Sequence, residues 1–300
     1  MAFKFLNKLV CFEVAAVEVK VLNVYNNEAL PGQDFRNGHG ESFLITAGSR
    51  EILLDTGWKG NILMQNICAL GIDVNAIDKI VLSHGHRDHT GGLPSLLEAR
   101  TETTPLPVIA HPDALEPKWV KRLIFHFPMG LPKLRKELAQ KMGFQLARNP
   151  EEILPRLSTT GEIAIAERTE KPGVARNAFH NVDGKRVWDP VIDDVSLVLQ
   201  TKSGLVMITG CCHSGLLNAC AKAVGLFGEP IKAIIGGTHM LAYSKEDIEH
   251  VGDMLEKVYA TPELYLNHCT GKHAIEQLRA RFGSDVVHDC FVGTELTFEI

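Results

Sequence analysis

Alternating apolar and polar positions predict a strand near the start of the chain. Val17, Val19 and Val21 alternate with Glu18 and Lys20, which is the period-two pattern of a half-buried strand. A loop rich in glycine and asparagine follows. The segments SFLIT and EILLDTG come next, separated only by the short turn AGSR. Because a tight turn between two apolar runs favours antiparallel pairing, we predict a hairpin over these segments.

Helical and strand patterns then alternate in two separate parts of the chain. Apolar spacing of about 3.6 residues predicts helices, and short apolar runs predict strands. The first part covers NILMQNICALG, DKIVLS, GLPSLLEAR and PVIAHP; the second covers VSLVLQ, LVMITG, LLNACAKAVG, IKAIIGG, SKEDIEHVGDMLEKVY, ELYLNHC and GKHAIEQLRARFG. The helix from Ser244 has a capping box that ends at Asp247. Strands that feed helices in this way indicate an α/β (α+β) fold.

The middle of the chain breaks this alternation. From about residue 112 to 194 prolines and charges are frequent, and only LPKLRKELAQKMG has a helical pattern. Apolar and aromatic residues such as Trp119, Phe125, Phe127 and Met129 suit a pocket wall or a subunit contact. We therefore predict one domain over residues 1–300, with an insertion or lid at about 112–194.

Composition limits the classes of binding partner and the cellular compartment that we expect for this protein. The formal net charge is −5, without a basic run, so we expect neither nucleic acid nor membrane as a partner. Seven scattered cysteines without a CxxC pair fit reduced thiols, and thus a cytoplasmic protein. Glu13 and Glu18 interrupt the first apolar stretch, which predicts a mature start rather than a leader. A homo-oligomer is compatible with these features.

The stretch SHGHRDHTGG carries the strongest chemical signal. It places three histidines and an aspartate, His84, His86, Asp88 and His89, within six positions just after a predicted strand. Histidine and carboxylate together suit zinc, manganese or ferrous iron, whereas calcium and magnesium favour oxygen ligands. A short loop of this kind can serve two metal ions about 3.5–4 Å apart.

These residues resemble a known family. HGHRDH matches the HxHxDH signature of the metallo-β-lactamase superfamily, and LLDTG, GCCHSG, GGTHM and NHCTG match further pieces in order. The chain is most similar to the branch of dihydropterin-ribofuranosylaminobenzene phosphate synthase-like and phosphodiesterase-like metallohydrolases, from Val17 to the C-terminus. The resemblance implies an αββα sandwich, in which two packed mixed β-sheets are flanked by helices and the metal site lies at one sheet edge.

The resemblance also implies two sets of metal ligands. One ion would be held by His84, His86 and His213, and the other by Asp88, His89 and His268. His213 and His268 directly follow predicted strands, as expected of ligands at strand ends. The expected cofactors are two divalent transition-metal ions, zinc first, with manganese or iron as alternatives.

The sequence departs from the superfamily at one ligand. Cys211 and Cys212 stand near the place where an aspartate commonly bridges both metals. Three alternatives stay open: the Cys211 thiolate, an acid among Asp189, Asp193 and Asp194, or water without a bridging side chain.

Further candidates have supporting roles. The family position of Asp55 suggests a carboxylate that orients a histidine or the loop, the alternative being a turn aspartate. Asp88 and His239 are the catalytic candidates. His239 follows a strand and could contact the substrate or leaving group. The alternative for His239 is a structural role. Helices that start after His213 and His268, aided by Lys272, would favour an anion.

The chemistry that follows is hydrolysis. Metal ions lower the pKa of bound water and polarise the attacked group, so we predict a metal-dependent hydrolase whose metal-bound hydroxide attacks a small anionic substrate such as a phosphodiester. One alternative is a pterin-related synthase that forms a C–N bond at the same metal site. Another is a non-catalytic ligand-binding sensor on the same fold. A nuclease would need basic surfaces, which the sequence lacks.

Overall fold

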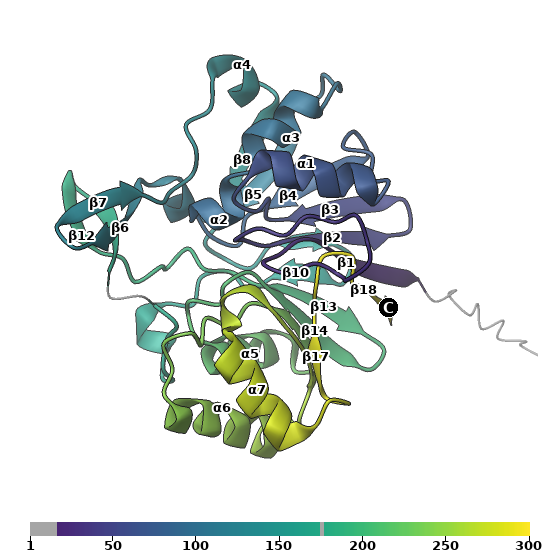
Figure 1. Ribbon diagram of the computed structural model, residues 1–300, viewed down its shortest axis with the longest axis vertical. Helices are drawn as coiled ribbons and strands as arrows, with labels where there is room; N and C mark the ends of the chain where they lie inside the picture. The colour runs from purple at the N-terminus through teal and green to yellow at the C-terminus, as the bar shows by residue number, and fades with distance from the viewer. Residues whose placement is uncertain (1–16, 175–176) are drawn as a thin grey trace, which may run out of the picture.

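The structure, a computed structural model, describes residues 17–174 and 177–300 (Figure 1). The expectation that the chain has no leader falls mostly on residues 1–16, which lie outside the described residues. Two large mixed sheets pack face to face, and helices cover the outer face of each. In Figure 1, α1 and α3 lie above the pair of sheets, and α5, α6 and α7 lie below it. This layering confirms the predicted αββα sandwich.

The first large sheet contains the opening strand and the predicted hairpin. Its order is β18-β1-β2-β3-β4-β5-β8. The strands are β1 (Glu18–Tyr25), β2 (Ser42–Ala47), β3 (Arg50–Leu54), β4 (Ile77–Val81), β5 (Leu106–Ala110), β8 (Met142–Leu146) and β18 (Glu295–Glu299). The outer helices on this side are α1 (Gly60–Ala69) and α3 (Leu93–Ala99).

The second large sheet is built mainly from the C-terminal part. Its order is β17-β16-β15-β14-β13-β10-β9. The strands are β9 (Glu152–Leu154), β10 (Leu157–Thr159), β13 (Leu197–Thr201), β14 (Gly204–Thr209), β15 (Ile231–Gly236), β16 (Glu263–Leu266) and β17 (Val287–Asp289). Its helices are α5 (Leu216–Phe227), α6 (Lys245–Lys257) and α7 (Lys272–Phe282). The capping box of α6 is confirmed, because Ser244 and Asp247 exchange hydrogen bonds of 2.8 and 3.2 Å.

Alternation along the strands fills three core layers. In β3, Ile52 and Leu54 belong to the layer between the two sheets, whereas Leu53 belongs to the layer under α1 and α3. The third layer packs Leu217 and the other inward residues of α5, α6 and α7 against the second sheet. Because successive side chains of a strand point to opposite faces, each sheet contributes side chains to two core layers.

The predicted insertion at 112–194 is not one unit. Strand β8 pairs with β5, and β10 pairs with β13, so residues 142–159 complete the two large sheets. The predicted helix over 131–143 is wrong in extent: α4 covers only Lys136–Ala139, because Met142 instead pairs with Leu106 in the sheet. Burial of apolar strand residues outweighs local helix propensity here.

The remainder of that segment forms a third, small sheet. Its order is β12-β11-β6-β7, with β6 (Lys118–Arg122), β7 (Phe125–Pro128), β11 (Ala178–Val182) and β12 (Lys185–Trp188). In Figure 1 it projects to the left of the sandwich. Short helical turns complete the described chain at α2 (Arg87–Thr90), η1 (Pro112–Leu115), η2 (Ile165–Glu167) and η3 (His268–Thr270). Among the described residues, every helix is too short or too polar for a bilayer crossing.

Candidate metal centre

The ligand candidates lie in loops that follow three strands. Residues 84–89 follow β4, His213 follows β14, and His268 follows β16. Strands β14, β15 and β16 are parallel, so their carboxyl ends meet at one edge of the second sheet. Strands β3, β4 and β5 of the first sheet are also parallel, so the loop after β4 lies at the edge formed by their carboxyl ends. The edges of the two sheets meet at the ligand candidates, since side chains of this loop lie close to those that follow β14 and β16.

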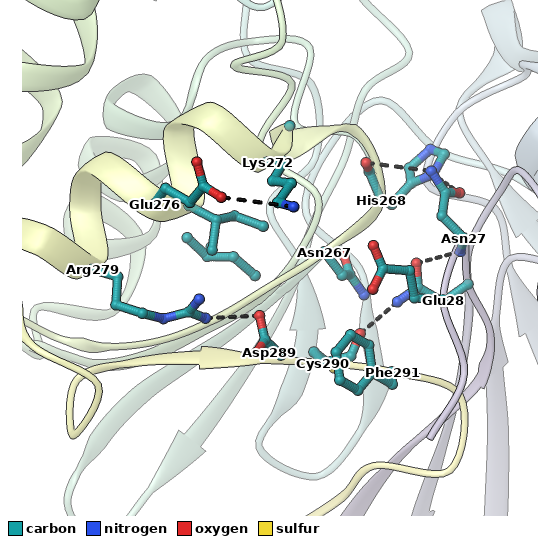
Figure 2. Close-up of a pocket in the computed structure, with 14 residues that line it drawn as sticks. Asn27, Glu28, Asn267, His268, Lys272, Glu276, Arg279, Asp289, Cys290 and Phe291 are labelled. Atoms are coloured by element: carbon teal, nitrogen blue, oxygen red, sulfur yellow. Dashed lines mark hydrogen bonds and ion pairs between the residues drawn. The ribbon is translucent and has the colours of Figure 1, made fainter. Parts of the chain in front are cut away.

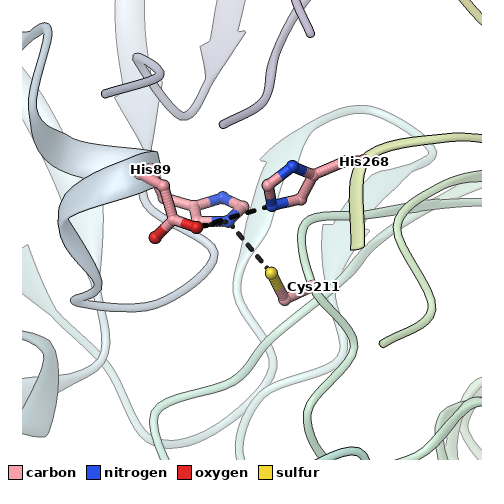
Figure 3. Close-up of side chains that lie close together, drawn as sticks. His89, Cys211 and His268 are labelled. Atoms are coloured by element: carbon pink, nitrogen blue, oxygen red, sulfur yellow. Dashed lines mark hydrogen bonds and ion pairs between the residues drawn. The ribbon is translucent and has the colours of Figure 1, made fainter. Parts of the chain in front are cut away.

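All six predicted ligands meet there, together with Cys211. The potential ligand atoms fall into three groups, each spanning at most 4.8 Å: Asp88, His89, Cys211 and His268; His84, Cys211 and His213; and His84, His86 and Asp88. The Cys211 sulfur lies 3.1 Å from His89 Nε2 (Figure 3). The Nε2 atom of His268 lies 3.5 Å from Asp88 Oδ2. Cys211, His84 and Asp88 each belong to two groups, as expected for two adjacent metal ions.

The opposite ring nitrogens of four histidines are held by hydrogen bonds. In each case Nδ1 faces an oxygen, which leaves Nε2 directed at the centre. The pairs are His84 with Ser83 Oγ at 3.0 Å, His89 with Asp55 Oδ2 at 2.6 Å, His213 with the Gly173 carbonyl at 3.2 Å, and His268 with Asn27 Oδ1 at 2.9 Å. Metal-binding histidines commonly use such an acceptor to fix the tautomer and the ring orientation.

Three central atoms have no hydrogen-bond partner although they are buried. They are Asp88 Oδ1, His213 Nε2 and His268 Nε2, as judged within the described part of the chain. A buried polar atom without a partner costs roughly 1–3 kcal/mol. All three belong to side chains of the ligand groups, and a carboxylate oxygen and two imidazole nitrogens are donor atoms that bound transition-metal ions would satisfy.

Electrostatics favours the ligand forms of His84, His213 and Asp88. It does not favour that of His89, because the effect of burial is outweighed by the carboxylates of Asp55 and Asp88, which raise the pKa of His89 to about 10. Burial, together with the neighbouring histidines, holds the pKa values of His84 and His213 well below their usual range. Burial opposes ionisation of Asp88, but His89 and His268 outweigh it and hold the pKa of Asp88 well below normal. Burial also raises the pKa of the Cys211 thiol well above its usual value. A thiolate there requires a nearby cation, which a metal ion supplies.

Asp55 connects the first hairpin to this centre. Its Oδ1 accepts a hydrogen bond of 2.8 Å from the Ser83 amide, and its Oδ2 lies 2.6 Å from both Ser83 Oγ and His89 Nδ1. The residue is fully buried and has a φ of 59°, in the left-handed region. The carboxylate therefore contacts the back of a ligand histidine and takes no part in the ligand groups.

We expect Asp55→Asn to weaken metal binding by about 10- to 100-fold, because an amide at this position orients His89 less strongly than a carboxylate does. Competition with a metallochromic chelator would measure the affinity. Asp78→Asn is the matched control, since Asp78 hydrogen-bonds Arg50 and the Glu51 amide on the opposite part of the first sheet. Equal metal affinity in Asp55→Asn and wild type would contradict this role for Asp55.

The three acids considered as bridges hold the surrounding loops. Asp189 and Asp193 both lie 2.9 Å from the buried ammonium of Lys118 on β6. Asp193 also accepts a 2.7 Å hydrogen bond from the Gly85 amide, between the first two ligand histidines. Asp194 accepts one of 2.8 Å from the Ser214 amide, next to His213. These contacts position the loops, and Cys211 is the side chain that lies between the two halves of the site.

A cavity of about 180 Å³ opens onto the ligand atoms. Its floor includes His86, Asp88 and His213, and its wall includes Trp119 and Val120 of β6. The small sheet thus lies over one side of the centre, at the place where a lid was predicted. His239 also lines this cavity and contacts His213, with ring centroids 4.3 Å apart and ring planes tilted by 43°. Burial, with a contribution from His86, lowers the pKa of His239 to about 4.

Lys272 lies apart from the centre. It begins α7, its side chain is 88% exposed, and its Nζ is 3.8 Å from Glu276. It lines a different cavity, of about 290 Å³, next to Asn27 and behind the His268 ring (Figure 2). Acidic side chains, including Glu28 and Asp289, line that cavity too. Lys272 thus shares a cavity with His268 but does not line the cavity that opens onto the other ligand atoms.

Two residues at the centre were missed by the sequence reasoning. His39 Nε2 lies 3.2 Å from Asp88 Oδ2, and its ring centroid is 5.0 Å from that of His268. Glu41 is fully buried, and its Oε2 accepts a 3.3 Å hydrogen bond from the Gly237 amide. Gly40 between them has a φ of 128°, and a Cβ there would meet the Asp88 carbonyl at 2.2 Å. The sequence signal that could have identified this loop was His39, a histidine with a glycine on each side.

Comparisons with known proteins agree with this geometry. The sequence profile of the metallo-β-lactamase superfamily matches residues 36–212. The 7,8-dihydropterin-6-methyl-4-(β-D-ribofuranosyl)-aminobenzene-5′-phosphate synthase of Methanocaldococcus jannaschii is 30% identical over 277 residues, which cover 89% of this chain and 92% of the relative.

Two solved structures are also similar. A metal-dependent hydrolase of the β-lactamase superfamily has a TM-score of 0.76 and 28% identity, covering 93% of this chain and 98% of its own. A metallo-β-lactamase fold protein from Bacillus subtilis has a TM-score of 0.53 at 14% identity, covering 95% of this chain and 100% of its own, and this likeness concerns the fold alone.

Proposed function

Since the chain belongs to the metallo-β-lactamase superfamily, we propose that it is a dinuclear metal-dependent hydrolase that acts on a small anionic substrate. The observation that carries this proposal is the convergence of seven side chains on one centre, where three buried atoms, Asp88 Oδ1, His213 Nε2 and His268 Nε2, lack a hydrogen-bond partner among the described residues. Asp88, His84 and Cys211 each contribute to two of the ligand groups, which supports two ions rather than one.

One ion would be held by His84, His86 and His213, and the other by Asp88, His89 and His268, with the Cys211 sulfur between them. A thiolate among imidazoles favours zinc or iron over the harder manganese ion. When bound, such ions lower the pKa of water and polarise a phosphoryl or carbonyl oxygen.

The surrounding residues bind and orient. Asp55 and Asn27 fix His89 and His268, so the ligand rings require little rearrangement. Trp119 and Val120 exclude water from one side of the cavity. His239 is neutral at pH 7, since its pKa is about 4, so a ring N–H can donate a hydrogen bond to an anionic substrate or to a leaving group.

A second candidate function is supported by one relative. The archaeal protein that is 30% identical over most of this chain is named as a dihydropterin aminobenzene phosphate synthase. A synthase that forms a C–N bond could use the same centre to polarise the group that leaves. In that case the same ligands are needed, but an amine nitrogen of one substrate replaces the leaving group on a carbon of the other, and the leaving group and a proton are released.

We expect protein reconstituted with zinc to bind about two ions per chain and to hydrolyse at least one member of a panel of phosphodiesters, phosphomonoesters, lactones and thioesters. Elemental analysis measures the first and product release the second. Less than half an equivalent of metal would contradict the metal proposal. Two ions without hydrolysis, combined with a coupled product from a dihydropterin and an aminobenzene phosphate, would favour the synthase.

We expect Trp119→Ala to raise KM several-fold or to change the preferred substrate while leaving metal content unchanged, because Trp119 lines the cavity without belonging to a ligand group. This single change is a cleaner test of the lid than removal of residues 112–194, which include strands of both large sheets. Val187→Ala, on the outer strand of the small sheet, is the control. Loss of metal in Trp119→Ala would show that the wall is part of the metal site.

A further inference from the structure

The small sheet has two exposed edges of different chemistry. Strands β12 and β7 are the terminal strands of its order. The β12 strand, KRVW, carries Lys185 and Arg186, whereas the β7 strand, FHFP, carries no lysine, arginine or acidic residue. Charged side chains on an edge strand prevent pairing with another sheet, and an apolar, uncharged edge invites it. Of these two edges in the described part of the chain, β7 alone lacks charged side chains, and its remaining protection is its short length and its terminal Pro128.

The register shows which backbone groups of β7 face outward. The Met129 amide donates a 2.8 Å hydrogen bond to the Lys118 carbonyl directly opposite, and Val120 lies opposite Phe127. Since hydrogen-bonded pairs alternate along antiparallel strands, Phe125 and Phe127 bond to β6. The N–H and C=O of His126 consequently point away from the sheet, as does the C=O of Pro128.

Apolar side chains surround this edge. Leu123, Ile124 and Phe125 are 89%, 80% and 61% exposed, and Phe127 is 47% exposed. A stable interface buries roughly 800 Å² on each partner, and one aromatic side chain can bury about 150–250 Å². The two phenylalanines and the aliphatic hairpin tip thus supply a large part of the area that an interface needs.

We propose that two copies of this chain associate by antiparallel pairing of their β7 strands about a two-fold axis at His126, which joins the two small sheets into one. Each His126 N–H then donates to the carbonyl of His126 of the partner subunit, and the hairpin tip at Ile124 lies beside the partner's Pro128. The proline has no N–H, so the pairing ends there.

A second copy fits this edge better than other occupants. The edge is self-complementary under a two-fold axis, as an isologous interface requires. Strands lie about 4.8 Å apart, so Lys121 on β6 would be about 14 Å from Lys121 of the partner subunit, beyond the Debye length of about 8 Å. The hydrocarbon core of a lipid bilayer would offer no hydrogen-bond partner to the His126 N–H and C=O.

The test compares two edges of the same sheet. We expect the wild-type chain to sediment as a dimer at micromolar concentration, and Phe125→Lys and His126→Pro to shift it to the monomer mass. Val187→Lys is the matched control, since Val187 is an exposed apolar residue of the other edge strand, and it should stay dimeric. Circular dichroism and zinc content report whether each variant is folded.

Site-specific cross-linking locates the axis independently. His126→Cys in a background of Cys11→Ser and Cys68→Ser should give a covalent dimer with a short bis-maleimide, whereas Val187→Cys in the same background should not. Monomeric wild type would overturn the proposal, whether or not the monomer binds anionic vesicles. A dimer that persists in both β7 variants would overturn the assignment of the interface to this edge.

Discussion

Replacing His84 by alanine is expected to lower turnover by about 10³-fold per folded molecule. His84 belongs to two of the three ligand groups, so its loss disturbs both metal positions. Metal ions contribute several kcal/mol of transition-state stabilisation in such sites, and each 1.36 kcal/mol corresponds to a factor of ten in rate. Steady-state kinetics with the best substrate of the panel, together with elemental analysis, would measure the effect.

The control for His84→Ala is His111→Ala. His111 is equally buried, but its Nε2 lies 3.0 Å from Glu162, away from the metal centre. Both variants leave a cavity and lower the free energy of unfolding, so both must be compared at equal amounts of folded protein. Near wild-type turnover in His84→Ala, or an equal loss in His111→Ala, would show that His84 has no role as a ligand.

Replacing Cys211 by alanine is expected to lower the affinity for metal more than 100-fold, because a shared ligand contributes more than the supporting residues, whose loss costs 10- to 100-fold. In cobalt-substituted protein, the sulfur-to-metal charge-transfer absorption should disappear. That absorption reports the Cys211–metal bond directly, whereas a structural role for Cys211 would leave it unchanged.

Cys212→Ala is the matched control for Cys211→Ala. Cys212 is also fully buried, but it packs in the core under α5 and belongs to none of the ligand groups. The charge-transfer absorption and the metal affinity should both survive in Cys212→Ala. If they survived in Cys211→Ala as well, the two metal ions would be linked without a cysteine ligand.

The fold was predictable where periodicity and burial agree. The opening strand, the hairpin and the alternation after Val195 follow from apolar spacing, because each element buries one continuous face. The predicted helix at 131–143 failed since β8 there completes a sheet whose partner, β5, is about 35 residues earlier in the sequence. Local propensity contains no information about such distant pairing.

The site was predictable in its ligand identities and much less so in its supporting contacts. His39 and Glu41 reach the centre from a loop before β2, and Lys272 stays outside it although it follows His268 closely in sequence. Asp189, Asp193 and Asp194 are near in sequence to the expected bridge, yet they bind Lys118 and backbone amides. Nearness along the chain did not distinguish a ligand from a residue that holds a loop.

The sequence by itself determined the strand-end histidines and the chemistry of their ligands, because four metal-binding side chains within six positions require only local geometry. It also determined the alternating faces that build the αββα layers. The tertiary structure decided between the alternatives that the sequence left open for Cys211 and Asp55, brought Asn27 to a ligand ring, and placed a small sheet along one side of the cavity. These features depend on contacts between residues up to 241 positions apart, which only the packing of the two sheets brings within hydrogen-bond distance.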